Sequence, residues 1–305
     1  MLRQTFLTLS NSNELKNIAL HNSTARKLAS RFVAGETLTE ALPAIRALNA
    51  KGIMATFDHL GENVASPDEA RAAADSYVAL IDAIRDAKLD SNVSLKLTQM
   101  GLDVDEELCY RNLSSICERA RQTDNFVRID MESSAYTDRT LDLFRRLWHE
   151  GGYKNVGVVL QAYLYRTESD VREMNALGAR VRLCKGAYNE PSTVAFAKKS
   201  DVDANYAKLT TLLLREGKYP ALATHDARLV SFAKRYAASK GIDPSRFEFQ
   251  MLYGIRRELQ DELVAQGYNV RVYVPYGSEW YPYYMRRLAE RPANVMFFMG
   301  NLLKR

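Results

Sequence analysis

The sequence predicts an α/β protein, and within that class a (β/α)8 TIM-type barrel preceded by an N-terminal helical arm. From residue 52 onward, short β-rich runs alternate with helical patterns, an order typical of parallel strands joined by crossover helices. There are eight such runs, and eight parallel strands favour a closed barrel. An open, doubly wound sheet is the alternative. It usually carries a Gly-rich phosphate loop after its first strand, and residues 58–62 (DHLGE) are no such loop.

Residues 1–51 stand outside this alternation and are predicted to form the arm, whereas residues 52–305 form the barrel. Asn13–Phe32 and Thr37–Ala50 have the amphipathic pattern of helices that pack against a larger body. Pro43 is expected in the first turn of the second helix, where proline is tolerated. No linker or low-complexity stretch separates the two parts, so we predict one domain overall.

The predicted strands are apolar, β-rich runs bounded by turn residues. In chain order they are Gly52–Phe57, Val93–Leu97, Phe126–Met131, Val156–Ala162, Ala179–Cys184, Ala221–Thr224, Phe247–Leu252 and Val270–Val274.

The segments between the strands carry helix start and stop signals. Residues 66–69 (SPDE) combine an N-cap serine, a first-turn proline and a glutamate that can complete a capping box. Thr167, Asp201 and Asp226 are expected to open three later helices. Three glycines fall near predicted helix ends: Gly151, Gly178 and Gly217.

Composition excludes several classes of protein. The formal net charge of +5 comes from scattered Lys and Arg, so nucleic-acid binding is not predicted. No apolar run approaches the roughly 20 residues that span a bilayer, and no signal peptide is visible, which predicts a cytoplasmic protein. Cys109, Cys117 and Cys184 lack metal-ligand spacing and are expected to be reduced thiols.

Every predicted strand ends in polar or ionisable residues, at the edge where a (β/α)8 barrel has its reactive face. In strand order these residues are Asp58 and Glu62, Lys96, Asp130 and Glu132, Gln161, Arg182 and Lys185, Thr224 and His225, Gln250, and Tyr273. A single one is commonly a satisfied structural side chain. Buried ionic groups are costly unless paired, so their presence at all eight strands favours a functional site.

The predicted last helix carries Arg286 and Arg287 one turn after Tyr283 and one turn before Glu290, on one helix face. Alone, such a pair is usually a solvated charged surface. Beside the barrel mouth, two guanidinium groups suit a small carboxylate on an apolar body. No zinc-type His spacing or GxSxG nucleophile is found, so we expect redox chemistry carried by an organic, phosphate-bearing cofactor, with no metal.

Eight segments carry a resemblance to a known family. In order they are DHLGE (58–62), SLKL (94–97), RIDME (128–132), LQAY (160–163), RLCKGAY (182–188), ATHD (223–226), FEFQMLYG (247–254) and YYMRRLAE (283–290). Together they resemble the FAD-dependent proline dehydrogenases, specifically the short monofunctional bacterial type. Each pattern is weak alone, but all eight occur in the family's order along the whole chain.

The resemblance implies roles for individual residues. Asp130 and Arg182 match catalytic positions, with Arg182 beside the reactive flavin nitrogen and Asp130 orienting Lys96 or Arg182. Glu62, paired with one of the adjacent arginines, matches an ion-pair gate over the substrate. Substrate-binding positions are Lys96, Arg286, Arg287, Tyr273, Tyr283 and Leu252. Cofactor-binding positions are Met131, Gln161, Arg182, Lys185, Gly186, Ala187, Thr224, His225 and Glu290.

The implied reaction is hydride transfer from L-proline to FAD, giving 1-pyrroline-5-carboxylate, the first step of proline catabolism to glutamate. The implied electron acceptor is a quinone, which would bring the cytoplasmic protein into transient peripheral contact with the inner face of the membrane.

Three alternatives stay open. The same flavin barrel could act on hydroxyproline or pipecolate, although Tyr273 against the ring would leave little room for an added hydroxyl. It could instead reduce a folate, with a nicotinamide donor. A basic scaffold or nucleic-acid binder is the alternative from another class, and it predicts cations on the outer helix faces and a colourless protein.

Overall fold

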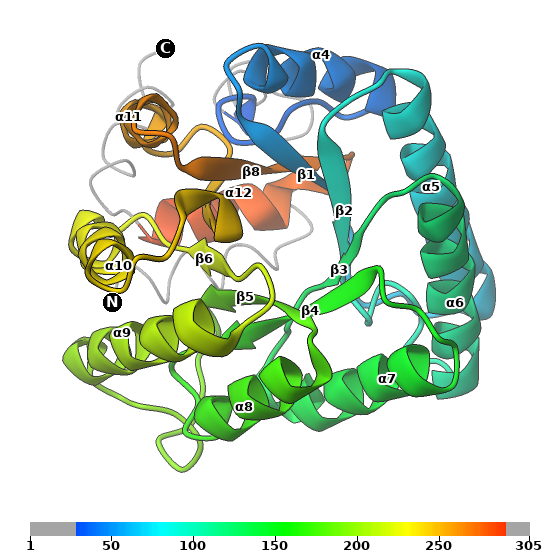
Figure 1. The fold of residues 1–305 in the computed structure, drawn as a ribbon. Coiled ribbons are helices and arrows are strands. Elements are labelled where there is room, and N and C mark those ends of the chain that lie inside the picture. The colour runs from blue at the N-terminus through cyan, green and yellow to red at the C-terminus, as the bar shows by residue number, and fades with distance from the viewer. Residues whose placement is uncertain (1–28, 291–305) are drawn as a thin grey trace, which may run out of the picture.

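The computed structural model describes residues 29–290, except for the side chains of residues 288–290. Its eight parallel strands pair in sequence order, and β8 pairs with β1, so the sheet closes on itself (Figure 1). This confirms the (β/α)8 barrel and excludes the open sheet. The strands are β1 (Met54–His59), β2 (Ser91–Leu95), β3 (Val127–Ile129), β4 (Val156–Gln161), β5 (Arg180–Cys184), β6 (Ala221–Ala223), β7 (Glu248–Leu252) and β8 (Asn269–Tyr276).

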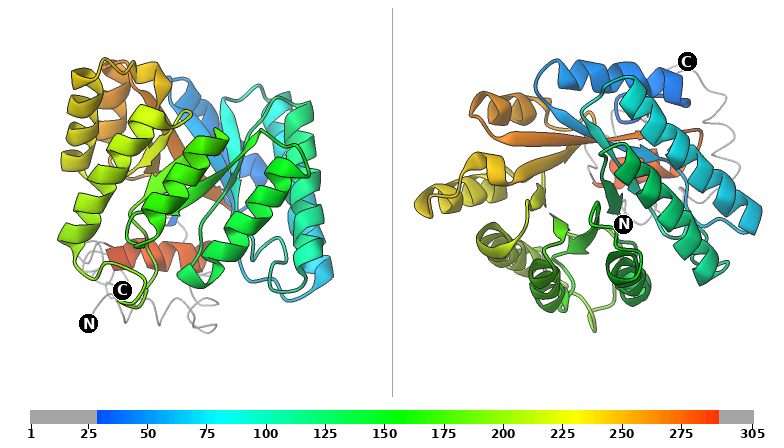
Figure 2. Two further views of the ribbon diagram at one scale, coloured as in Figure 1. Left: turned by 60° about the horizontal axis from the view of Figure 1, so that its bottom comes forward. Right: turned by 45° about the vertical axis from the view of Figure 1, so that its right-hand side comes forward.

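Helices surround the barrel, and α12 lies across one end of it (Figure 2). The helices are α4 (Leu38–Asn49), α5 (Pro67–Asp86), α6 (Glu106–Gln122), α7 (Thr137–His149), α8 (Thr167–Leu177), α9 (Lys199–Glu216), α10 (Ala227–Ser239), α11 (Arg257–Ala265) and α12 (Trp280–Glu290), with short 3-10 turns η1 (Ser134–Tyr136) and η2 (Pro244–Arg246). The outward-facing apolar residues of the strands pack with these helices into the main hydrophobic core.

The second predicted helix of the arm is present as α4, with Thr37 as its N-cap, and it contacts β1 and β8. Pro43 lies in the interior of α4, beyond the first turn, because the helix already begins at Leu38. The first predicted helix, Asn13–Phe32, falls almost wholly outside the described residues. The division into an arm (1–51) and a barrel (52–305) therefore stays a prediction.

Several predicted boundaries are wrong by a few residues. β1 continues beyond Phe57 to His59, β8 continues beyond Val274 to Tyr276, and β2 ends at Leu95, so that Lys96 follows the strand. α9 begins at Lys199, which places Asp201 in its first turn. The errors at Asp58 and Lys96 run in opposite directions: Asp58 was predicted to follow its strand but lies within β1, whereas Lys96 was predicted inside its strand but follows β2.

Most helix signals behave as predicted. The Ser66 side chain accepts the N–H of Glu69, at 3.2 Å, and Asp226 caps α10 by accepting the N–H of Arg228 at 3.1 Å. Gly178 ends α8 in the left-handed region, with φ of 70°. Thr167 is the first residue of α8 rather than its N-cap, and its hydroxyl donates to the carbonyl of Gln161.

The interior of the barrel is unusually polar. A TIM barrel is commonly filled by branched aliphatic side chains. Here Arg271 Nε donates one bifurcated hydrogen bond to the two carboxylate oxygens of Glu248, at 3.0 and 3.1 Å, while a second buried cation, Arg128, donates to the Val158 carbonyl at 3.1 Å. Because alternate residues of a strand point the same way, Arg128 and Arg271 lie one layer below Asp130 and Tyr273, which follow them by two residues at the barrel mouth.

Candidate functional site

Asp130 is the centre of a hydrogen-bonded cluster inside the barrel mouth. Its Oδ1 accepts from Arg182 Nη1 at 2.8 Å and from Ser94 Oγ at 2.7 Å, and its Oδ2 accepts from the Tyr273 hydroxyl at 2.8 Å. The Arg182 guanidinium lies over the Tyr273 ring, 5.3 Å from its centroid. Four strands, β2, β3, β5 and β8, thus bring their carboxyl ends to one carboxylate, which fixes both the arginine and the tyrosine.

Lys96 has a different partner from the one considered in the sequence. Its Nζ lies 3.6 Å from Asp58 Oδ1, and Asp130 contacts Arg182 instead. Burial alone would lower the pKa of Lys96, but the carboxylates of Asp58, Asp130 and Glu62 reverse this and raise it. Lys96 therefore stays cationic at the mouth. Burial raises the pKa of Asp58, and Lys96 only partly opposes that rise.

The paired arginines of α12 lie above this cluster. Arg286 Nη1 is 3.0 Å from Glu62 Oε1, and both side chains are about one-third exposed. The Arg287 guanidinium lies over the Tyr283 ring at 5.1 Å from its centroid. The charge of Glu62 raises the pKa of Lys96 and that of Arg286 lowers it, while Asp130 raises it as well. The α12 pair and the Asp130 cluster therefore belong to one cationic mouth. The side chain of Glu290 is outside the described part of the structure.

Two buried groups at the mouth, Arg182 of the Asp130 cluster and Gln161, have hydrogen-bonding atoms to spare. Within the described residues, Arg182 Nε and Nη2 and Gln161 Oε1 have no partner. Gln161 Nε2 donates to the Met131 carbonyl at 3.3 Å, which fixes the direction of the amide. Buried donors and acceptors without partners are costly. Their arrangement fits a bound group with both acceptor and donor atoms on its edge.

The ends of β6 and β7 are joined by His225. Its Nε2 accepts the N–H of Leu252 at 2.9 Å, and the neighbouring Thr224 hydroxyl oxygen accepts the N–H of Asp226 at 3.1 Å. Leu252 is also the register partner of Tyr273 on β8. Three predicted site residues, from β6, β7 and β8, therefore lie side by side.

Lys185, just after β5, is held by two aspartates. Its Nζ lies 2.5 Å from Asp203 Oδ1 and 3.2 Å from Asp226 Oδ2. A hydrogen bond from Arg228, supported by Lys185, holds the pKa of Asp226 well below its usual range. Gly186 follows with φ of 107°, and a Cβ there would lie 2.4 Å from the Tyr163 ring. Ala187 is exposed at the rim.

Sequence reasoning missed two residues that hold the site together, Ser94 and Asp203. Ser94 lies two residues before Lys96, and strand alternation was a signal that could have placed it, like Asp58, on the inner face. Asp203, the partner of Lys185, lies in the helix α9, and no local pattern marks it.

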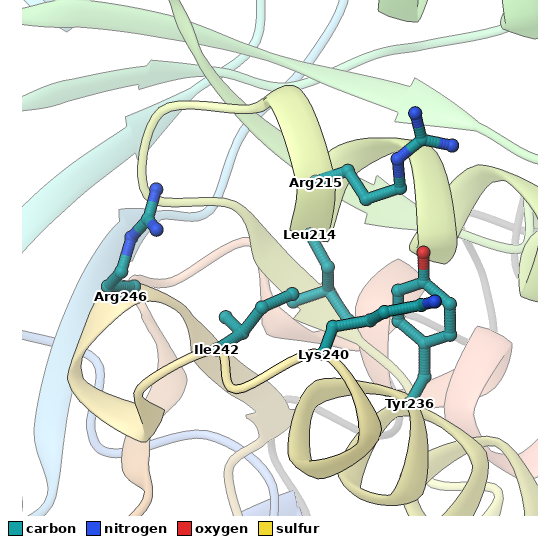
Figure 3. Close-up of a pocket in the computed structure, with 6 residues that line it drawn as sticks. All are labelled: Leu214, Arg215, Tyr236, Lys240, Ile242 and Arg246. Carbon is teal, nitrogen blue, oxygen red and sulfur yellow. The ribbon is translucent and has the colours of Figure 1, made fainter.

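A separate pocket of about 550 Å³ lies at the opposite end of the barrel (Figure 3). It is lined by Leu214, Arg215, Tyr236, Lys240, Ile242 and Arg246. The cations sit where α9 and α10 end, and basic side chains at helix C-termini offset the helix dipole. We therefore assign it no role in the site. Among residues 29–290, no side chains are grouped to hold a metal, and no helix is long and apolar enough to cross a membrane.

Comparisons with known proteins agree with this geometry. The family model described as proline dehydrogenase matches residues 41–299. The chain is 45% identical to "Proline dehydrogenase 2" of Bacillus subtilis, over 99% of each chain. It is 42% identical to "Proline dehydrogenase" of Deinococcus radiodurans, over 100% of this chain and 98% of the other.

A solved structure has the same fold. It is proline utilization A (PutA) from Bdellovibrio bacteriovorus, inactivated by N-propargylglycine, with a TM-score of 0.79 and 28% identity. The match covers 87% of this chain but 32% of PutA.

Proposed function

The chain belongs to the proline dehydrogenase family, and we propose that it oxidises L-proline to 1-pyrroline-5-carboxylate with FAD as its resident cofactor. The observation that supports this best is the geometry at Asp130. One carboxylate holds Arg182 at the barrel mouth with two of its donor nitrogens unpaired, next to a lysine and a pair of arginines. A small anionic substrate and a hydride acceptor both suit that arrangement.

The residues present fit a flavin. Its ring edge carries carbonyl oxygens and a nitrogen acceptor as well as an N–H, which match the spare donors of Arg182 and the spare acceptor of Gln161. When bound, FAD supplies a two-electron acceptor for hydride from carbon. Met131, Lys185, Gly186, Ala187, Thr224, His225 and Glu290 are proposed to complete the cofactor site.

The cationic mouth is proposed to bind and orient proline. Arg286, Arg287 and Lys96 would bind the carboxylate, and Tyr273, Tyr283 and Leu252 would pack against the ring. Arg182, kept in place by Asp130, would direct its free donors to where negative charge develops during hydride transfer. Glu62 would close over the substrate through its ion pair with Arg286.

We further propose that a quinone reoxidises the cofactor. The protein would then be cytoplasmic and make transient peripheral contact with the inner face of the membrane. This step, like the place of the reaction at the start of proline catabolism, is supported by the family resemblance.

The full-length protein tests the proposal directly. We expect a yellow preparation whose flavin absorbance bleaches when L-proline is added without oxygen, and a lower kcat/KM for hydroxyproline than for proline. A colourless protein that takes up no FAD would overturn the proposal. Bleaching by NADH and not by proline would instead support a folate reductase.

Replacing Arg286 with methionine tests the carboxylate site. The expected result is a KM for proline raised about 10- to 100-fold, because a charge-assisted hydrogen bond to the substrate is lost. FAD content after gel filtration should be unchanged, since Arg286 faces Glu62 and not the spare atoms of Gln161. Arg287→Met is expected to act in the same direction.

The matched control is Arg85→Met, which removes an exposed helix arginine paired with Asp82 and Asp86. It should leave both KM and FAD content at wild-type values. Wild-type kinetics in Arg286→Met would place that arginine on a solvated surface and outside the substrate site.

A further inference from the structure

The loop that carries Glu62, here called the gate loop (residues 60–65), has its middle held by one residue. The N–H of Asn63 donates to Thr98 Oγ1 at 3.3 Å, and the N–H of Val64 donates to the Thr98 carbonyl at 3.4 Å. These contacts begin at the residue that follows Glu62. The side chain and backbone of Thr98 together therefore determine where the backbone beside Glu62 lies.

Thr98 is in turn held by Glu132, at the end of β3. Glu132 Oε1 accepts the Thr98 N–H at 3.0 Å, and Oε2 accepts the Thr98 hydroxyl at 2.7 Å. Thr98 is fully buried and Glu132 is 6% exposed. A hydroxyl has one hydrogen to donate, and here the carboxylate takes it. The lone pairs of the hydroxyl are then available to the N–H of Asn63. Glu132 therefore makes the Thr98 hydroxyl the acceptor in its hydrogen bond with Asn63.

The conformation of the gate loop makes this contact consequential. Asn63 has φ of 56°, in the left-handed region, where asparagine is tolerated better than most residues. This backbone conformation comes immediately after Glu62. Beside it, Gln99 Nε2 donates to the His59 carbonyl at 3.1 Å, and a Cβ on Gly61 would lie 2.6 Å from that nitrogen. The gate loop is thus seated closely on residues 98 and 99.

We propose that Thr98 and Glu132 form a latch that positions Glu62 opposite Arg286 and so controls how tightly the gate retains substrate. The inference rests on the proposed function, because it takes the Glu62–Arg286 pair to be the gate. Neither latch residue touches the reacting atoms, so both are positioning residues.

The latch matters because the ion pair is weak without it. The side chains of Glu62 and Arg286 are 32% and 31% exposed, and exposed pairs lose much of their attraction to solvent and to side-chain entropy. A backbone held in one place reduces the ordering that the pair itself must supply. The attraction between Glu62 and Arg286 therefore closes the gate, and the latch holds Glu62 in position for that ion pair.

Thr98→Val removes the hydroxyl at nearly constant shape and is the first test. The amides of Asn63 and Val64 should exchange hydrogen about three- to tenfold faster, measured by mass spectrometry on the peptide that covers the gate loop. The KM for proline should rise by a similar factor, with kcat changed less than about twofold. Thr98→Ser keeps the hydroxyl and should restore wild-type exchange and KM.

Glu132→Gln is the second test, and it covers the case in which the valine variant fails to fold. An amide replaces one acceptor with a donor, so the hydroxyl of Thr98 can no longer keep its direction. We expect the same faster exchange and higher KM. In a Glu62→Gln background, Thr98→Val should add no further rise in KM, because both changes act through the same ion pair.

The outcomes separate this inference from the function on which it rests. Unchanged exchange in both latch variants, or an equal KM shift with and without Glu62, would overturn the latch while proline oxidation stands. A wild-type protein that does not oxidise proline would overturn the function, and the exchange measurement would still show whether Thr98 holds the gate loop.

Discussion

Replacing Arg182 with methionine is expected to lower kcat for proline by about 10²- to 10³-fold, the usual effect of removing one preorganised donor for developing charge. Arg182 is 5% exposed, its Nη1 is anchored by Asp130 and Ser94, and its other two donor nitrogens are unspent. The KM for proline should change far less, because the carboxylate is assigned to the arginines of α12. Stopped-flow measurement of anaerobic flavin bleaching gives the rate of the chemical step directly.

Arg180→Met is the matched control for this change. Arg180 lies two residues earlier on β5, on the same face of the strand, but its guanidinium stacks on Phe126 and Tyr219 away from the mouth. It should keep a near-wild-type bleaching rate, whereas Arg182→Lys, which keeps the charge but loses the planar fork, should fall in between. A wild-type rate in Arg182→Met would remove Arg182 from the catalytic group.

The fold could be predicted because its signals are local. Eight β-rich runs separated by capped helices specify a parallel arrangement without knowledge of any distant contact. The boundaries were less predictable for a physical reason. Asp58 was predicted to follow the first strand but lies within β1, because a charged residue after an apolar run is typical of a strand end, and in this barrel polar side chains bind to each other in the interior.

The site was predictable as a set of positions but not as a set of partners. Parallel strands bring their carboxyl ends to one edge, so Lys96, Asp130 and Arg182 had to lie near one another. Which carboxylate each cation would select depends on the closure of the barrel. Lys96 lies against Asp58 and Arg182 against Asp130, and no spacing in the sequence distinguishes that pairing from its reverse. The latch residue Thr98 could not be predicted for the same reason, since its partners Asn63 and Glu132 are distant in the sequence.

The polar interior leads to the second large effect. Glu248→Gln is expected to lower the free energy of unfolding by about 3–5 kcal/mol, the usual cost of removing one partner from a buried ion pair. Glu248 and Arg271 are 2% and 7% exposed, and the glutamine would leave the guanidinium of Arg271 without a counter-charge. Arg128 lies near the same carboxylate, so a second buried cation loses its compensation. Urea titration measures the change.

Glu168→Gln is the matched control, because Glu168 also has two cationic partners, Arg172 and Lys208, but lies on the outside of α8. It should lower the free energy of unfolding by only about 0–1 kcal/mol.

The pH dependence of stability adds a second check on Glu248. Burial opposes ionisation of Glu248, but Arg271 outweighs it and lowers the pKa below the ordinary 4.5, so the stabilisation is complete above that pH and is lost as the pH falls towards the lower, folded-state value. The stability gap between wild type and Glu248→Gln should therefore be constant at neutral pH and narrow only below pH 4.5; a gap that is absent at neutral pH would mean that the barrel tolerates an unpaired Arg271.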